Sequence, residues 1–95
     1  MNEEAIQLAV DRLAQRFSPE RIVLFGSHAR GDADPHSDVD LLVVASFDGD
    51  RLGTMLAMDR SLRGLRIPRD IVVYTPEEYE TERPVSYTHL TLPTN

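Results

Sequence analysis

Two short apolar runs separated by a polar segment that begins with glycine constrain the fold of this chain most strongly. The first run, RIVLF, covers residues 21–25, and the second, DVDLLVVA, covers residues 38–45. Both are rich in β-branched or large apolar residues and short enough to be buried strands. The segment between them begins GSHARG, and its first glycine lets the chain leave a strand through a tight turn. We therefore expect two strands joined by a turn or short helix at residues 26–31 and a polar loop at residues 32–37.

Two aspartates stand at the start of the second strand. Asp38 and Asp40 are separated by one residue, and because strand side chains alternate between faces, both project the same way with Cα atoms about 6.5 Å apart. Carboxylates on one face repel each other unless a cation lies between them. The alternative is that Asp38 caps the strand and Asp40 faces solvent. Aspartate is depleted in strands, and the run LLVV that follows indicates burial, so we favour a metal site.

The turn before these acids is a candidate phosphate site. Backbone N–H groups at Gly26 and Ser27 are placed to face a phosphate, although a simple tight turn explains the glycine equally well. The pattern is not a P-loop, because Asp32-Ala33 follows the second glycine where a P-loop has lysine and serine or threonine. Arg30 is equally consistent with a guanidinium directed at phosphate and with a weak salt bridge to a loop aspartate.

A third apolar run, RDIVVY at residues 69–74, also has an acid at its start. If this strand neighbours the strand of Asp38, Asp70 joins the other two carboxylates at one edge of the sheet. Hard oxygen ligands of this kind suit Mg²⁺, and a substrate triphosphate can complete the coordination shell. The alternative is that Asp70 only pairs with Arg69 or Arg66. We favour the metal site and include Asp70 in it.

The remaining elements are helices. Periodic apolar residues predict one helix over residues 3–17 and another over residues 51–63. A further helix begins at Thr75, where Thr-Pro-Glu-Glu forms a capping box with proline at the first helical position. The helix over residues 51–63 is expected to bury Leu52, Met55, Leu56 and Leu62.

Composition excludes several classes of protein. Ninety-five residues suffice for one small domain. The net charge of −6 argues against extended nucleic-acid binding, and all ten basic residues are arginine, which excludes a lysine nucleophile. There is no cysteine and no long apolar run, so we expect a cytoplasmic protein that does not enter the membrane.

Taken together, GSHARG, SDVDLLVV and RDIVVY resemble the minimal nucleotidyltransferases of the DNA polymerase beta superfamily. The pattern of that family is G-S-x-x-R-G, a short polar loop, S-D-x-D-L-x-V, and a later strand with a third acid. The resemblance covers residues 21–74, and Asp70 rests on its position in the third strand alone. The matching residues are Gly26, Ser27, Arg30, Gly31, Ser37, Asp38, Asp40, Leu41 and Val43.

The resemblance implies an α/β (α+β) fold, a small mixed β-sheet with helices packed on one face. It also implies Mg²⁺-dependent transfer of a nucleoside monophosphate from ATP or another NTP, with two metal ions about 3.5–4 Å apart. On this basis Asp38, Asp40 and Asp70 form the catalytic and metal-binding set, with Asp70 helping to activate the acceptor hydroxyl. Gly26 and Ser27, with Arg30, form the nucleotide-binding set.

Stand-alone members of this family often work beside a small helical partner protein, many as antitoxins that adenylylate the toxin of a toxin–antitoxin pair. The resemblance therefore implies an NTP and a helical protein acceptor supplied in trans as partners. The competing hypothesis is a binding module of the same fold that neutralises its partner by contact alone. The crowded carboxylates favour the enzyme, since a pure binder has no need of them.

The last eleven residues differ in character from the rest of the chain. VSYTHLTLPTN, residues 85–95, contains no charged residue other than histidine and the terminus, and prolines frame it. An edge strand is one reading. We expect instead that it is a foreign tail on a truncated gene, so that residues 1–84 form the nucleotidyltransferase domain.

Overall fold

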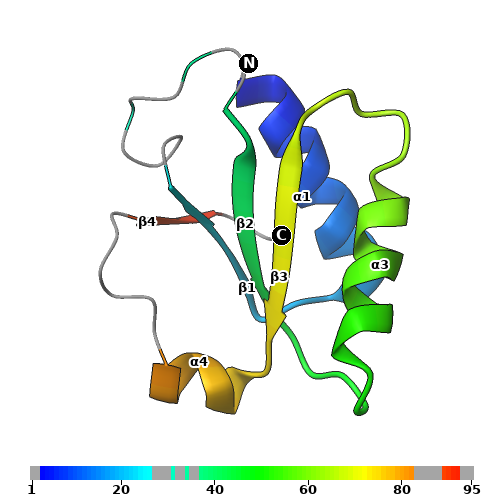
Figure 1. The fold of residues 1–95 in the computed structure, drawn as a ribbon, viewed down its shortest axis with the longest axis vertical. Coiled ribbons are helices and arrows are strands. Elements are labelled where there is room, and N and C mark those ends of the chain that lie inside the picture. The colour runs from blue at the N-terminus through cyan, green and yellow to red at the C-terminus, as the bar shows by residue number, and fades with distance from the viewer. Residues whose placement is uncertain (1–2, 27–30, 32–33, 35–36, 83–88, 93–95) are drawn as a thin grey trace.

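The computed structural model describes residues 3–26, 31, 34, 37–82 and 89–92. Within them the chain forms helices and strands in the order shown in Figure 1. The elements are α1 (Glu3–Phe17), β1 (Arg21–Phe25), β2 (Val39–Val44), α3 (Arg51–Ser61), β3 (Arg69–Tyr74), α4 (Pro76–Glu82) and β4 (His89–Leu92).

The four strands make one mixed sheet in the order β3-β2-β1-β4. β1 is antiparallel to β2 and to β4, whereas β2 and β3 are parallel. Parallel neighbours need a crossover connection, and α3 supplies it between β2 and β3. This crossover brings the starts of β2 and β3 to the same edge of the sheet, beside the end of β1 (Figure 1).

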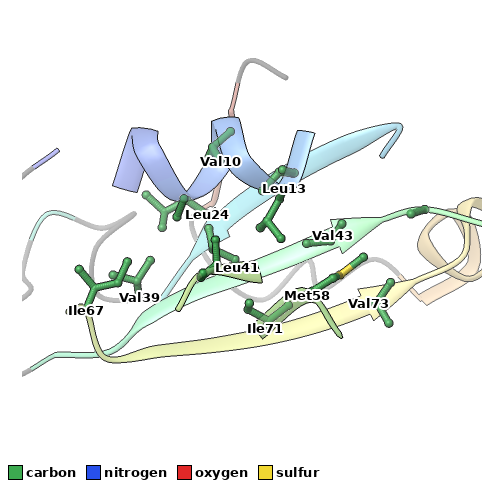
Figure 2. Close-up of a cluster of buried hydrophobic side chains, with 14 residues drawn as sticks. Val10, Leu13, Leu24, Val39, Leu41, Val43, Met58, Ile67, Ile71 and Val73 are labelled. Carbon is green, nitrogen blue, oxygen red and sulfur yellow. The ribbon is translucent and has the colours of Figure 1, made fainter. Parts of the chain in front are cut away.

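One face of the sheet carries the main hydrophobic core beneath α1 and α3. Figure 2 shows Val10 and Leu13 of α1 lying over Leu24, Leu41 and Val43 of the central strands. Met58 of α3 and Ile71 and Val73 of β3 extend the same cluster. Because strand residues alternate between faces, this packing turns the intervening residues of each strand to the opposite face.

The opposite face of the sheet carries a smaller hydrophobic cluster, on the side where β3 leads into α4. Val23, Leu42 and Val44 pack there with Tyr79 of α4. The start of α4 is fixed by the predicted capping box: Glu78 N–H donates to Thr75 Oγ1 (3.1 Å), and Thr75 N–H donates to Glu78 Oε1 (2.9 Å). The helices therefore pack mainly on one face, as expected, with one aromatic side chain of α4 on the other.

Three features differ from the sequence-based expectations. β2 begins at Val39, so Asp38 precedes the strand, and α3 ends at Ser61. Leu52 and Leu56 are 65% and 48% exposed, although the sequence predicted them to be buried. The reason is that α3 turns another stripe inward, and its apolar residues lie on more than one side of the helix. That inward stripe consists of Met55, Met58, Ser61 and Leu62.

The segment that the sequence marked as doubtful contributes an edge strand. β4 pairs with β1 in antiparallel register, from Ile22 opposite Leu92 to Phe25 opposite His89. The edge-strand reading is therefore the one that the structure supports for residues 89–92. The expectation that residues 85–95 are foreign to the protein stays a prediction. Among the described residues, no helix has both the length and the apolar character needed to cross a membrane.

Candidate active site

Two of the predicted acids lie at the same level of neighbouring strands. Asp40 is the second residue of β2 and Asp70 is the second residue of β3, and the two are register partners in the parallel pair. Neighbouring strands run about 4.8 Å apart, so the backbones at these positions are adjacent. The crossover through α3 creates this proximity from positions that lie far apart in the sequence.

Both carboxylates project from the face opposite α1 and α3. Leu41 and Ile71, the next residues along each strand, are buried in the main core, and alternation therefore turns Asp40 and Asp70 the other way. Asp40 is half-buried, whereas Asp70 is exposed. Two like charges thus share one edge of one face, as the sequence indicated.

Asp38 lies one residue before β2 and is exposed. Carrying the alternation of β2 back by one residue gives Asp38 the same face as Asp40. The backbone around Asp38 is fixed on both sides. Val39 N–H donates to Pro68 O (2.8 Å), and Ser37 Oγ accepts from Asp34 N–H (3.0 Å) and donates to Asp34 Oδ1 (3.2 Å).

The predicted turn meets the acids directly. Phe25, the last residue of β1, is the register partner of Asp40, and Gly26 follows it with φ of 77°. A Cβ placed on Gly26 would lie 2.3 Å from Asp40 Oδ2, so the Asp40 carboxylate would have to move to make room for it. The positive φ favours glycine here, and the missing Cβ lets the Asp40 carboxylate lie against the turn.

The remaining predicted nucleotide-binding residues, Ser27 and Arg30, lie outside the described residues. In the part of the chain that is described, no three acidic or histidine side chains are grouped closely enough to hold a metal ion. The strand register brings Asp40 and Asp70 together, and the Gly26 contact adds the turn. The three-carboxylate metal site itself stays a prediction.

The donor set nevertheless fits a divalent cation. Carboxylate oxygens are the ligands that Mg²⁺ prefers, and Mg²⁺ usually takes only one or two of them from the protein and completes its shell with water and phosphate. The space that a Cβ of Gly26 would fill lies against Asp40 Oδ2.

Arg69, one of the two arginines considered from the sequence as partners of Asp70, pairs with another acid. The Arg69 side chain forms an ion pair with Asp59 of α3, with Nε 2.9 Å from Asp59 Oδ1. No local sequence pattern indicates this pair, because it forms across the α3–β3 connection. It leaves the negative charge of Asp70 at the sheet edge.

Where β2 and β3 end, away from the aspartates, an arginine and a glutamate form an ion pair. Arg51 of α3 donates to Val73 O (2.6 Å) and to the carboxylate of Glu78. The bond from Arg51 to Glu78, together with the bond from the Thr75 N–H, lowers the pKa of Glu78 from 4.5 to about 2. A hollow of about 250 Å³ near this end is lined by Glu20, Arg21, Val44, Pro76, Glu77, Tyr79 and Glu80. None of the predicted site residues lines it.

Comparison with known proteins decides the family. Residues 6–89 match the profile of the family described as "Nucleotidyltransferase domain". The chain belongs to this nucleotidyltransferase family. The match includes β2 and β3, the two strands that carry Asp40 and Asp70, and the residues between β1 and β2. The resemblance inferred from the motifs is therefore confirmed.

Individual relatives agree with this assignment. A "putative protein adenylyltransferase" of Methanocaldococcus jannaschii is 45% identical over 53 residues, which is 53% of this chain and 53% of that protein. A second protein of the same description and organism is 60% identical over 25 residues, 26% of this chain and 25% of its own length. The first match thus spans about half the length of each protein, and the second about a quarter.

A solved structure confirms the fold. A "putative nucleotidyltransferase" from Sulfolobus solfataricus superimposes with a TM-score of 0.72 at 24% identity, covering 97% of this chain and 79% of that one. At this level of identity the similarity establishes the shared architecture. The small α/β fold with a mixed sheet, expected from the motifs, is therefore confirmed.

Proposed function

We propose that this nucleotidyltransferase moves AMP from ATP onto a hydroxyl group of a partner protein in a Mg²⁺-dependent reaction. The single observation that carries the proposal is the placement of Asp40 and Asp70 at the same level of parallel strands, against the Gly26 turn. The names of the Methanocaldococcus relatives support AMP as the transferred group and protein as the acceptor.

Each residue has a distinct role in the proposed reaction. Asp38 and Asp40 would hold Mg²⁺, which when bound neutralises charge on the triphosphate. The acceptor oxygen attacks the α-phosphorus, the bond from that phosphorus to the bridging oxygen of the β-phosphate breaks, and pyrophosphate leaves. Asp70 accepts the proton of the acceptor hydroxyl. Gly26 lets the backbone approach the phosphates, where Ser27 and Arg30 would add contacts.

Labelling with α-³²P-ATP tests this proposal. The chain is incubated with the nucleotide, Mg²⁺ and clarified cell lysate, and transfer appears as a labelled protein band. Asp38→Asn and Asp40→Asn are expected to abolish the label that depends on the added chain. With γ-³²P-ATP this chain-dependent band should be absent, because the γ-phosphate departs with pyrophosphate. Asp48→Asn changes an exposed acid before α3 and serves as the matched control. Equal labelling by the double variant and wild type would refute the assignment.

A contact-only binding module of the same fold is the second candidate. The observation that favours it is that the described residues contain no assembled three-carboxylate group. This alternative predicts that neither ATP nor Mg²⁺ binds and that neutralisation of the partner survives Asp38→Asn and Asp40→Asn. Calorimetric titration of the chain with ATP in the presence of Mg²⁺ distinguishes the two functions.

A further inference from the structure

The connection from α3 to β3 is held by arginines from outside it. Arg12 of α1 donates through Nη1 to the carbonyl oxygens of Ser61 (3.2 Å) and Arg63 (3.1 Å). The last carbonyl groups of a helix have no partners within the helix, so these bonds satisfy them and tie the end of α3 to α1.

Arg69 holds the same connection from its other end. Its Nε and Nη2 donate to Asp59 Oδ1 (2.9 Å) and Asp59 O (3.1 Å). Its Nη1 donates to Leu65 O (3.1 Å), with a longer contact of 3.4 Å to Ile67 O. The side chain is only 15% exposed. One rigid guanidinium thus bridges α3 and the loop that follows it, a geometry that an ammonium group does not reproduce.

This loop sets where β3 begins. Pro68, its last residue, accepts the hydrogen bond from Val39 N–H (2.8 Å), and the parallel register of β2 and β3 starts with Val39 opposite Arg69. The next pair in the register is Asp40 and Asp70. Because neighbouring strand residues face opposite sides, Arg69 fixes the backbone of Asp70 without neutralising its carboxylate.

We propose that Arg69 is a positioning residue for nucleotidyl transfer, clamping the α3–β3 connection so that Asp70 stays level with Asp40. The inference rests on the proposed function, in which Asp70 activates the acceptor hydroxyl. Displacement of a reacting group by about 1 Å can lower a rate by about 10²-fold. Loss of the Arg69 contacts therefore lowers the rate of the chemical step. Nucleotide binding, in the proposed function, depends instead on the Gly26 turn and on Asp38 and Asp40.

The kinetic test compares Arg69→Ala with Arg66→Ala, a change at an exposed arginine in the same connection. Labelling of the lysate acceptor by α-³²P-ATP is measured as initial rate against ATP concentration. For Arg69→Ala we expect the rate at saturating ATP to fall by about 10- to 100-fold. The half-saturating ATP concentration should change less than about twofold, because the contacts that bind ATP before reaction are retained. Arg66→Ala should match wild type.

Two further measurements separate positioning from general destabilisation. In an Asp70→Asn background, Arg69→Ala should cause no additional loss of rate, since both changes act through one carboxylate. Amide hydrogen exchange should show faster exchange of the Val39 amide in Arg69→Ala, while the Val43 amide near the other end of β2 keeps its wild-type rate. Additive losses, or equal acceleration at both amides, would overturn the proposal.

The result also separates this inference from the proposed function. If Asp40→Asn labels as well as wild type, the proposed function fails and the role of Arg69 fails with it. If Asp40→Asn abolishes labelling while Arg69→Ala retains the full rate, only the positioning role is overturned. Should Arg69→Ala not fold, Arg69→Lys answers the same question, because lysine keeps the charge beside Asp59 but cannot make the forked contacts.

Discussion

At the end of the sheet where β2 and β3 finish, a carboxylate is held by an arginine, whereas at the end where they begin, aspartates occupy the same level of neighbouring strands. Glu78 receives bonds from Arg51 and from the Thr75 N–H, and these contacts keep its pKa near 2. Asp40 and Asp70 instead share an edge and a face, and the nearby Arg69 is engaged by Asp59.

This comparison separates a carboxylate that stabilises the fold from carboxylates that do not. The charge of Glu78 is matched by a cation, so it contributes to the stability of α4. Placing Asp40 beside Asp70 is unfavourable for the folded chain alone, since like charges on neighbouring strands repel. Such local conflicts are characteristic of functional sites, where stability is given up for activity.

Exchanging a carboxylate for its amide should have opposite consequences at the two ends. Asp40→Asn is expected to reduce acceptor labelling by about 10³-fold or more. Glu78→Gln is expected to leave labelling unchanged and to lower the melting temperature by roughly a few degrees. Labelling rates and thermal melts of both variants decide this. A large loss of activity in Glu78→Gln would contradict the division.

Adding one methyl group at Gly26 should lower the activity of the site at the end of the sheet that carries Asp40 and Asp70. Gly26→Ala forces an L-residue into φ of 77° and drives its Cβ into Asp40, so labelling should fall by about 10²-fold. Gly49→Ala is the matched control: Gly49 has φ of 72° but no atom within 4 Å of an added Cβ. That variant should lose about 1–2 kcal/mol of stability from the backbone conformation alone and keep its activity. Similar kinetics in the two variants would show that the Asp40 contact is irrelevant.

Truncating one buried valine at each end gives a finer comparison. Val39 and Val44 are 0% and 1% exposed, at opposite ends of β2. Val39→Ala and Val44→Ala should each lower the free energy of unfolding by about 1–2 kcal/mol. Only Val39→Ala, which loosens the residue between Asp38 and Asp40, should also reduce labelling, by about tenfold. Urea denaturation and the labelling assay measure the two effects, and equal activity losses would argue against a localised site.

Acid should weaken the Glu78 end over a defined range of pH. The pKa of Glu78 is lowered on folding from 4.5 to about 2, so its contribution to stability is present above pH 4.5 and is lost as the pH falls toward 2. Glu78→Gln should therefore show a smaller drop in melting temperature between pH 5 and pH 3 than wild type. If both proteins lose stability equally over this interval, the Arg51–Glu78 pair does not contribute as described.

Local sequence patterns predicted most of the fold, while contacts across the chain escaped them. The capping box at Thr75 and the glycine turn at Gly26 depend on neighbours in sequence, so their residues can be read directly. The exposure of Leu52 and Leu56 depends on which stripe of α3 meets the sheet, and the apolar residues of that helix do not define one stripe. The pairing of Arg69 with Asp59 likewise requires the folded connection between α3 and β3.

The positions of the three aspartates could likewise be predicted only in part from the sequence. Strand alternation predicted the shared face of Asp38 and Asp40, but the level at which Asp70 stands is set by the parallel register of β2 and β3. No pattern within residues 69–74 fixes that register. It is determined by the length of the α3 crossover and by the hydrogen bond from Val39 to Pro68.

The most direct test is a crystal structure of the chain with Mg²⁺ and an ATP analogue that cannot be cleaved between the α- and β-phosphates. The account predicts a metal ion bound by Asp38 and Asp40, with the triphosphate lying against the Gly26 turn and the α-phosphate facing Asp70. A nucleotide bound elsewhere, such as in the hollow beside Tyr79, or a triphosphate held without either aspartate, would contradict it.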